Sequence, residues 1–421
     1  RAGTLLVKQD WREEEIEERG EPIYAQRWVV LCEEPDRARA LEDEIARSLP
    51  GSRCVAVDMT AGGIAARYEA AVQQILAGLQ EIFETRPRSD VLVQVVTPAS
   101  GDGAVFAGLS GLLRTARLEQ PKLIGQIIGF DAAEPAAGVV AKLRENAGAP
   151  QDEEVRYAGG ERLVGKWSEV PADVNDEIPW RDGGVYLLTG GAGGLGLIFA
   201  KEIAEQAKDT VLVLTGRSEL TEAKQAALES LQQLGARVVY RRVDVSDRAA
   251  VLELVSGIKE QFGGLTGIVH GAGVLRDSFI MNKTAADASA VIAPKVAGVV
   301  NLDEATRDCA LECMILFGSA SGAFGNVGQA DYAAANGFLD AYASYRNELM
   351  RAGRRRGRTL SIDWPLWQDG GMQVDAAVLQ AQRSRGIAPL TTANGLAAFY
   401  RANGAAASRV VVMSGEVERL R

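Results

Sequence analysis

Short runs of apolar residues alternate with amphipathic stretches through the first third of the chain. Runs rich in β-branched and aromatic residues predict strands at 28–32, 53–57, 91–96 and 123–130. Apolar residues with helical spacing predict helices that alternate with these strands. One ends near residue 49, and the others cover 66–83, 104–119 and 136–146. Strands that alternate with helices in this way predict a doubly wound parallel sheet.

The pattern changes near residue 170 and divides the chain in two. Residues 155–163 predict a short hairpin, and the polar stretch 168–182 that follows contains two prolines. Beyond it, apolar runs predict seven strands, at 185–189, 210–215, 237–242, 267–270, 314–319, 359–363 and 409–413. We therefore expect an α/β protein with two Rossmann-like doubly wound parallel sheets, a truncated one in residues 1–175 and a complete one in residues 176–421.

Composition narrows the classes of function. The 421 residues carry a formal net charge of −10, which repels a phosphate backbone, so we expect no nucleic-acid partner. The four cysteines are scattered and His270 is the only histidine, which favours a reduced, cytoplasmic protein without a metal site. No leader-like or membrane-spanning apolar run is present, and the start Arg-Ala-Gly suggests part of a longer polypeptide.

A glycine-rich loop follows the first strand of the second half. It comprises Thr189, Gly190, Gly191, Ala192, Gly193, Gly194, Leu195 and Gly196, and a helical pattern begins within it. Glycine allows the chain to turn sharply and the backbone to approach a pyrophosphate at the start of a helix. Between a strand and a helix, this spacing predicts a dinucleotide site, whereas alone it would fit a flexible turn.

The residues after the next two strands favour NADPH over NADH. Arg217 stands where an NAD-dependent protein usually presents a carboxylate to the ribose, and its guanidinium suits a 2′-phosphate. Asp244 and Val245 follow the third strand, where a carboxylate can accept a hydrogen bond from adenine. Alternatively, Arg217 is a solvated surface residue and Asp244 caps the following helix.

The first half lacks such a loop. After its first strand come Glu33, Glu34, Pro35 and Asp36, which would repel phosphates. We therefore expect this half to be structural and to bind no cofactor.

Reduction of a ketone needs a proton donor beside the carbonyl oxygen, and with one histidine in the chain a Tyr or Lys is the natural candidate. Tyr332 opens a predicted helix shortly after the strand that ends at Ser319. Asn336 lies one helical turn after Tyr332, so the two side chains share a face.

These residues carry a family resemblance. Residues 184–421 resemble the short-chain dehydrogenase/reductases and, among them, the ketoreductase domains of bacterial modular polyketide synthases. In those domains the Asn and Lys exchange places relative to the wider superfamily, and Asn336 and Lys295 follow the exchanged pattern. The first half, with Trp11 and the stretch 113–119, is also typical, so the resemblance covers essentially the whole chain.

The resemblance implies a role for each matching residue. Tyr332 would donate the proton, Lys295 would lower the pKa of Tyr332, Ser319 would bind the substrate oxygen, and Asn336 would hold a water or Lys295. Gly271, Ala272 and Gly273 would lie beside the nicotinamide ribose, with His270 structural. Each residue also has a structural alternative: Ser319 as a cap, Lys295 as a solvated helix residue, Tyr332 as packing.

The resemblance further implies stereocontrol and a lid. Asp277 matches the Asp of domains that make the D (3R) alcohol, although Arg276 replaces the Asp that usually precedes it, and Phe324 stands where the opposite class has Trp. Trp367 and Met372 lie in a stretch similar to a mobile lid, in a form typical of synthases whose acyltransferase acts in trans.

The implied partners are an acyl carrier protein with a phosphopantetheine-tethered β-ketoacyl substrate, and neighbouring synthase domains. A basic run between Arg351 and Arg358 is either a solvated loop or a contact for an acidic carrier. Two alternatives are a catalytically silent, structural ketoreductase domain and a free-standing reductase of a small ketone.

Overall fold

The computed structural model describes residues 2–421 except 17–21, 61, 172–177 and 373. Its strands form one continuous sheet in the order β10-β9-β8-β11-β12-β13-β14-β1-β7-β6-β5-β4-β2-β3. In the first half the strands are β1 Ala2–Glu13, β2 Gln26–Leu31, β3 Arg53–Ala56, β4 Val91–Pro98, β5 Leu123–Phe130, β6 Glu154–Ala158 and β7 Glu161–Glu169. In the second half they are β8 Val185–Thr189, β9 Val211–Gly216, β10 Arg237–Arg242, β11 Gly267–His270, β12 Cys313–Ser319, β13 Arg358–Trp364 and β14 Arg409–Glu416.

Both halves have the expected doubly wound topology. The seven strands of the second half are all parallel, and β2 to β6 form a smaller parallel set in the first half. The predicted α/β fold, with a truncated set of parallel strands in the first half and a complete set in the second, is therefore confirmed. The hairpin expected at 155–163 is also present, as the antiparallel pair β6 and β7.

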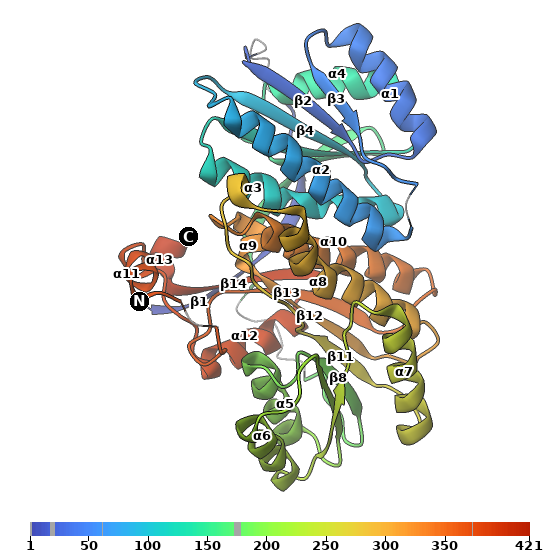
Figure 1. Cartoon of the computed structure of the whole chain (residues 1–421), viewed down its shortest axis with the longest axis vertical. Helices are drawn as coiled ribbons and strands as arrows, with labels where there is room; N and C mark the ends of the chain where they lie inside the picture. Colours follow the sequence, from blue (N-terminus) through green and yellow to red (C-terminus); the bar gives the residue numbers. More distant parts are fainter. Residues whose placement is uncertain (1, 17–21, 61, 172–177, 373) are drawn as a thin grey trace.

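Strand β1 joins the two sheets, which the hydrophobic pattern did not predict. It pairs antiparallel with β14 on one side and with β7 on the other (Figure 1). Its Leu5, Leu6 and Val7 are buried, but the charged residues that follow hide this strand in the sequence. The N-terminal segment therefore ties the two halves into a single sheet.

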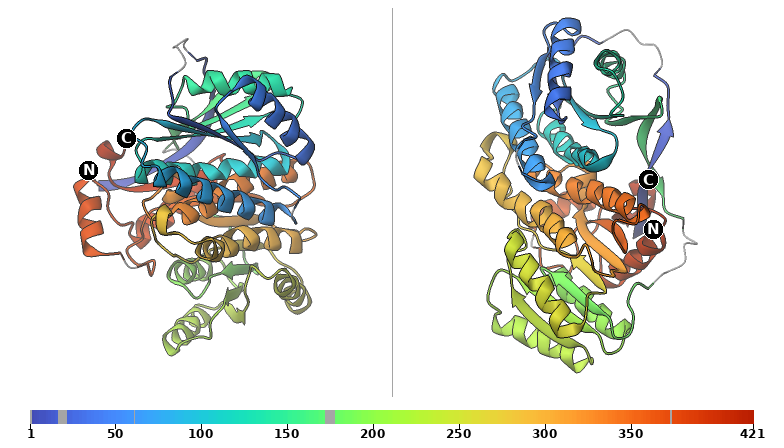
Figure 2. Two further views of the ribbon diagram at one scale, coloured as in Figure 1. Left: turned by 45° about the horizontal axis from the view of Figure 1, so that its top comes forward. Right: turned by 90° about the vertical axis from the view of Figure 1, so that its right-hand side faces the viewer.

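Helices cover both faces of the sheet (Figures 1 and 2). Those of the first half are α1 Pro35–Ser48, α2 Ile64–Glu84, η1 Gly101–Leu109, α3 Ser110–Glu119 and α4 Ala136–Ala147. Those of the second half are α5 Gly194–Gln206, α6 Glu222–Gln233, α7 Arg248–Phe262, η2 Ile280–Asn282, α8 Ala285–Ala305, α9 Ala320–Phe324, α10 Ala330–Arg351, α11 Ala376–Ser384, α12 Thr392–Gly404 and α13 Val417–Leu420. The helix expected at 104–119 is divided into the 3₁₀ segment η1 and α3.

One hydrophobic core continues across both halves. Helices α2 and α3 pack against α8 and α10, so residues such as Tyr68 and Phe338, whose ring centres are 4.6 Å apart, belong to a shared cluster. The Tyr68 hydroxyl also donates to the Ala334 carbonyl at 2.8 Å. The first half is thus packed directly on the helix that carries Tyr332.

Among the described residues, α8 is the one helix whose length and apolar composition would allow it to span a membrane. More than half of its most apolar window is buried inside the protein, and it carries Lys295 at its centre. It is a core helix of the second half.

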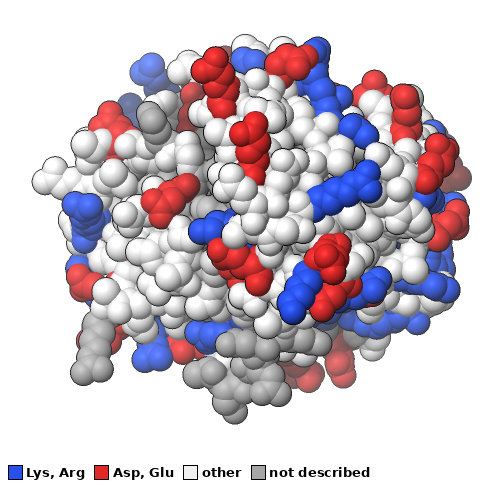
Figure 3. Space-filling model, turned by 90° about the horizontal axis from the view of Figure 1, so that it is seen from below, with Lys and Arg blue, Asp and Glu red and all other residues white. Residues whose placement is uncertain are grey.

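Charges of both signs are interspersed on the face shown in Figure 3. The basic run is partly internal: Arg355 is buried and binds Asp303 at 2.9 Å, and Arg358 donates to the carbonyls of Asn403 and Ala405. This end of α10 lies about 30 Å from Tyr332, at 1.5 Å per residue along a helix. Arg351, Arg354 and Arg356 are exposed, so the run is solvated in part, and its contact with an acidic carrier stays a prediction.

Candidate active site

The cofactor loop lies between β8 and α5, as expected. Helix α5 begins at Gly194, its N-cap is Gly193, and no side chain caps it. The first backbone N–H groups of a helix have no intrahelical acceptor and carry partial positive charge. This uncapped end therefore fits a pyrophosphate, which would occupy the position of a capping side chain.

Thr189 and His270 join this loop to the loop after β11. Thr189 Oγ1 lies 2.7 Å from His270 Nδ1 and accepts from the Ala272 N–H at 3.3 Å, while the Gly271 N–H donates to the Thr189 carbonyl at 3.1 Å. Burial, and then the charge of Lys295, lower the pKa of His270 to about 3. His270 is therefore a neutral, structural residue.

Arg217 and Asp244 follow β9 and β10, the two strands that come after the glycine loop in the chain. Arg217 follows β9, is exposed, and has no hydrogen-bond partner in the described part of the chain, so its guanidinium is free for a phosphate. Asp244 Oδ1 accepts from the Ser246 N–H at 3.0 Å and from its hydroxyl at 2.6 Å. Burial acts to raise the Asp244 pKa, but these bonds and the Arg217 charge outweigh it and leave the pKa low.

Asp244 does not cap the next helix, because Asp247 does so. The Asp247 carboxylate accepts from the N–H groups of Ala249 and Ala250. Asp244 and the buried Val245 thus remain at the edge where an adenine would lie.

Three elements bring the catalytic candidates together. Ser319 ends β12, Lys295 lies in the middle of α8, and Tyr332 lies in the first turn of α10. Lys295 Nζ donates to the Phe317 carbonyl at 2.8 Å and lies 5.7 Å from the centre of the Tyr332 ring. Asn336 Nδ2 donates to the Tyr332 carbonyl at 2.7 Å.

The pKa of Tyr332 is raised, in contrast to the lowering that the sequence led us to expect. Burial raises it, and hydrogen bonds with Asn336 and Ser319 offset this only in part. The expected partner, Lys295, donates instead to the Phe317 carbonyl. A raised pKa keeps the phenol protonated at neutral pH, which is the form that can donate a proton.

Burial also acts on Lys295. It lowers the pKa of the ammonium to about 8, although Asp363 and Asp340 act in the opposite direction. Lys295 therefore remains largely protonated at neutral pH. Asn336 Oδ1 is buried without a hydrogen-bond partner among the described residues, so it can accept from a water or a ligand.

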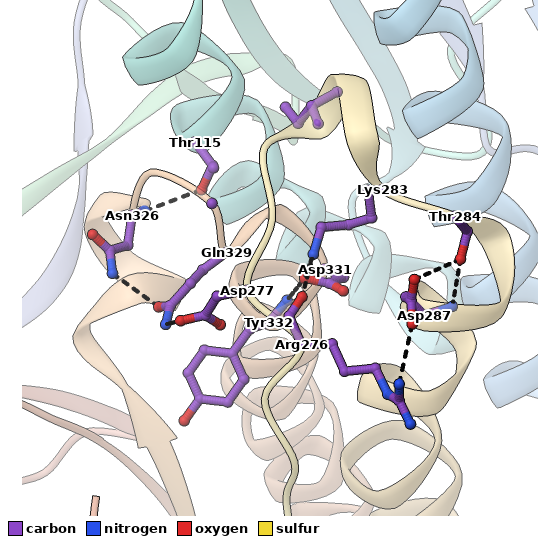
Figure 4. Close-up of polar contacts among 12 residues, drawn as sticks. Thr115, Arg276, Asp277, Lys283, Thr284, Asp287, Asn326, Gln329, Asp331 and Tyr332 are labelled. Carbon is purple, nitrogen blue, oxygen red and sulfur yellow. Dashed lines mark hydrogen bonds and ion pairs between the residues drawn. The ribbon is translucent and has the colours of Figure 1, made fainter. Parts of the chain in front are cut away.

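Asp277 lies beside Tyr332, the predicted proton donor (Figure 4). It is exposed, and its Oδ2 accepts from Gln329 Nε2 at 2.9 Å. The sequence analysis missed Gln329, whose only signal was its position three residues before Tyr332, almost one helical turn away. Phe324, at the end of α9, is 40% exposed, and its ring centre is 5.5 Å from that of Trp167.

Two of the residues predicted to contact substrate lie in the segment after β13. Trp367 is 3% exposed and packs in the core beside Trp364, with ring centres 5.0 Å apart. Met372, in contrast, is 47% exposed. A substrate contact of either residue stays a prediction.

The segment after β13 touches the glycine loop. A Cβ at Gly194 would overlap the Gly370 carbonyl, so only glycine allows this approach. Helix α11, which follows in the chain, has no buried residue. The part of this segment around Gly370 is thus packed on the glycine loop, while α11 lies open to solvent.

Exposed apolar side chains gather on the loops that follow β11, β12 and β13. Seven of the twelve exposed large hydrophobic residues in the described part of the chain lie there: Leu275, Phe279, Met281, Phe324, Val327, Met372 and Val378. Contiguous exposed apolar surface is uncommon and marks binding sites. In doubly wound sheets, ligands bind beyond the carboxyl ends of the strands, which is where these loops lie.

Comparisons with known proteins agree with this arrangement. The family model described as "KR domain" matches residues 184–369. The chain is 42% identical over 99% of its length to "Polyketide synthase PksN" of Bacillus subtilis (strain 168), and 40% identical over 99% to "Polyketide synthase PksL" of the same organism. It spans only 8% and 9% of the length of these relatives.

A solved structure is similar over the whole chain. The ketoreductase domain from the bacillaene assembly line shares 40% sequence identity, with a TM-score of 0.93 over 100% of this chain and 99% of that one. Both halves of the sheet are therefore part of the shared architecture. The chain thus belongs to the ketoreductase domains of polyketide synthases, which are oxidoreductases of the short-chain dehydrogenase/reductase fold that use a nicotinamide cofactor.

Proposed function

We propose that this domain uses NADPH to reduce the β-keto group of a polyketide intermediate bound to an acyl carrier protein, giving the D (3R) alcohol. The observation that carries the proposal is the position of Tyr332: its side chain lies within hydrogen-bonding reach of Ser319 and Asn336, and its ring centre is 5.7 Å from Lys295 Nζ. A catalytically silent domain would lack one of these groups or the glycine loop.

NADPH is favoured by the free guanidinium of Arg217, which suits a 2′-phosphate. The uncapped start of α5 would hold the pyrophosphate, and Gly271 to Gly273 would lie beside the nicotinamide ribose. When bound, the nicotinamide supplies the hydride that forms the new C–H bond.

Tyr332 donates its phenolic proton to the carbonyl oxygen as the π electron pair of the C=O bond moves onto that oxygen. Ser319 donates a hydrogen bond to the same oxygen and stabilises the developing charge. The ammonium of Lys295 stabilises the phenolate that remains, because opposite charges favour the ionised form. The free Asn336 Oδ1 holds the water that returns a proton to Tyr332.

The substrate class follows from the apolar loops around the cleft. A polyketide acyl chain is apolar enough to cover them, whereas a small hydrophilic ketone would leave them in water.

Asp277, held beside Tyr332 by Gln329, supports D stereochemistry. We further propose a cytoplasmic synthase of the trans-acyltransferase type, in which neighbouring domains and the carrier protein are the partners. The cofactor-free first half disfavours a free-standing reductase of a small metabolite.

A first test measures NADPH absorbance decay with a β-ketoacyl N-acetylcysteamine thioester. Tyr332→Phe should lower turnover by about 10²–10⁴-fold, because general acid catalysis is lost, while NADPH fluorescence titration shows unchanged binding. Chiral chromatography should show mainly the D alcohol. Binding of NADPH without reduction by the unsubstituted protein would favour the silent scaffold, and mainly L product would overturn the stereochemical proposal.

A second test concerns the choice of cofactor. Arg217→Ser should raise the KM for NADPH by about tenfold or more, since a charge-assisted phosphate contact is lost, and leave the KM for NADH nearly unchanged. Arg248→Ser, on an exposed residue of α7, serves as the matched control. Equal effects of the Arg217 substitution on both cofactors would contradict the assignment.

A further inference from the structure

Helix α3 of the first half is bound to two loops that border the cleft. Glu119, the last residue of α3, accepts from the Gly328 N–H through Oε1 at 2.9 Å and from the Ile280 N–H through Oε2 at 2.8 Å. Gly328 lies in the loop before Tyr332, and Ile280 lies in the loop that carries Asp277. One carboxylate therefore bridges the two loops.

Further contacts from the first half support both loops. One turn before Glu119, Thr115 Oγ1 accepts from the Asn326 N–H at 3.1 Å (Figure 4), and Arg114 Nη1 donates to the Ala323 carbonyl at 2.7 Å. Gln80 of α2 donates to the carbonyls of Ile280 and Lys283, each at 2.8 Å. The first half thus contacts the main chain of each loop at more than one point.

The bridged loops carry the groups that face a substrate. They are joined to each other by the Ser278 N–H, which donates to the Gly328 carbonyl at 2.9 Å, and by the Gln329–Asp277 hydrogen bond. Lys283 Nζ donates to the Arg276 carbonyl and to Asp331, the neighbour of Tyr332, at 2.8 and 2.9 Å. A shift of either loop would therefore change the position of Asp277 relative to Tyr332 (Figure 4).

Only a carboxylate can accept a hydrogen bond from a backbone N–H group of each loop in this way. It offers two acceptor oxygens, whereas an amide offers one acceptor and places N–H donors against the second backbone N–H. Hydrogen bonds to a charged acceptor are also stronger than those between neutral groups. We propose that Glu119 is a positioning residue: it sets the distance between the two substrate loops and so controls which face of the ketone is reduced. This inference rests on the proposed reduction and gives the cofactor-free half a role in its selectivity.

The test compares Glu119→Gln with Glu84→Gln, an exposed glutamate at the end of α2 in the same half. In Glu119→Gln, the KM for the thioester and the ratio of minor to major alcohol should each rise about tenfold, as expected for the loss of one charge-assisted hydrogen bond. The dissociation constant for NADPH should change less than about twofold, because the cofactor loop is not contacted by Glu119. Glu84→Gln should behave as the unsubstituted protein.

Hydrogen exchange provides a readout that needs no turnover. Peptides covering 276–283 and 324–329 should both exchange faster in Glu119→Gln, whereas 189–196 should not change. Unchanged exchange in either loop, or an unchanged KM and product ratio in an active protein, would overturn the inference. Failure of the unsubstituted protein to reduce the thioester would instead count against the proposed function. In that case the hydrogen-exchange rates of the two loops would still show whether Glu119 bridges them.

Discussion

At the scale of single residues, burial decides the protonation states in the cleft. Burial raises the pKa of Tyr332, whose phenol is already protonated at neutral pH at its ordinary pKa of about 10. Lys295 keeps most of its charge at neutral pH because burial lowers its pKa only to about 8. The two groups thus remain an acid and a cation side by side. The same environment keeps the neighbouring His270 neutral, since a second positive charge next to Lys295 would be unfavourable.

The pKa of His270 gives a testable prediction. Because the chain has no other histidine, an imidazole signal in an NMR titration comes from His270 alone. Its imidazole pKa falls from 6.5 to about 3, so between these values the unfolded chain binds a proton that the folded protein does not. Stability should therefore decrease as pH falls through this window, by at most about 1.4 kcal/mol per pH unit. NMR of the imidazole should show a neutral ring at pH 5, and a titration midpoint near 6.5 would contradict the burial argument.

Removal of the imidazole should reduce that dependence. Between pH 6.5 and 5, His270→Asn should lose less unfolding free energy than the unsubstituted protein, as measured by urea denaturation at each pH. Identical losses would show that carboxylates alone cause the acid instability.

At the scale of elements, the start of α10 is held by a buried ion pair. Lys283 and Asp331 are 2.9 Å apart, with side chains 0% and 1% exposed. Such a pair adds little net stability, but removal of one partner leaves an uncompensated charge in the interior. The pair orients the helix end that carries Tyr332.

Asp331→Asn should therefore destabilise the protein by about 3–5 kcal/mol, measured by urea denaturation. The double variant Lys283→Met with Asp331→Asn should recover most of that loss, since no charge remains buried. Glu169→Gln, which breaks an exposed pair with Arg421, is the control and should cost less than about 1 kcal/mol. A double variant no more stable than Asp331→Asn would show that the pair acts through something other than its charges.

At the scale of the whole molecule, the two halves behave as one body. They share a continuous sheet through β1, and a common core joins α2 and α3 to α8 and α10. The contact is closest where η1 crosses α10: a Cβ at Gly337 would overlap the Gly108 carbonyl. Because Gly337 directly follows Asn336, the packing of the first half fixes the position of the catalytic helix.

Gly337→Ala tests this contact against helix propensity. Alanine favours a helix over glycine by about 1 kcal/mol, but overpacking at this contact costs about 1–3 kcal/mol, so we expect a net loss of stability and of activity. Gly257→Ala in α7 is the matched control, because its added methyl would meet no atom within 4 Å. Thermal denaturation should show Gly257→Ala stabilised and Gly337→Ala destabilised, and stabilisation of both would mean that the two halves are not tightly packed.

Local features of the sequence were sufficient for the elements and for most of the candidate site. Apolar runs that alternate with helically spaced apolar residues predicted both sets of parallel strands. The spacing of apolar residues shows which side of a strand or helix is buried, so it can be read from the sequence. The glycine loop, Ser319 and the Tyr332–Asn336 spacing were recognisable because strand ends and helical turns place them together. Strand β1 was missed, since only three of its residues are buried and most of the others are polar.

The sequence by itself thus determined the fold class and the positions of the glycine loop and of the candidate catalytic residues, all of which depend on short-range spacing. Only the tertiary structure decided the direction of the Tyr332 pKa shift, the core position of Trp367 and the bridge from Glu119 to the two loops. These features depend on burial and on contacts between residues about 160 to 210 positions apart. No local pattern encodes such contacts, because they form only when the two halves pack together.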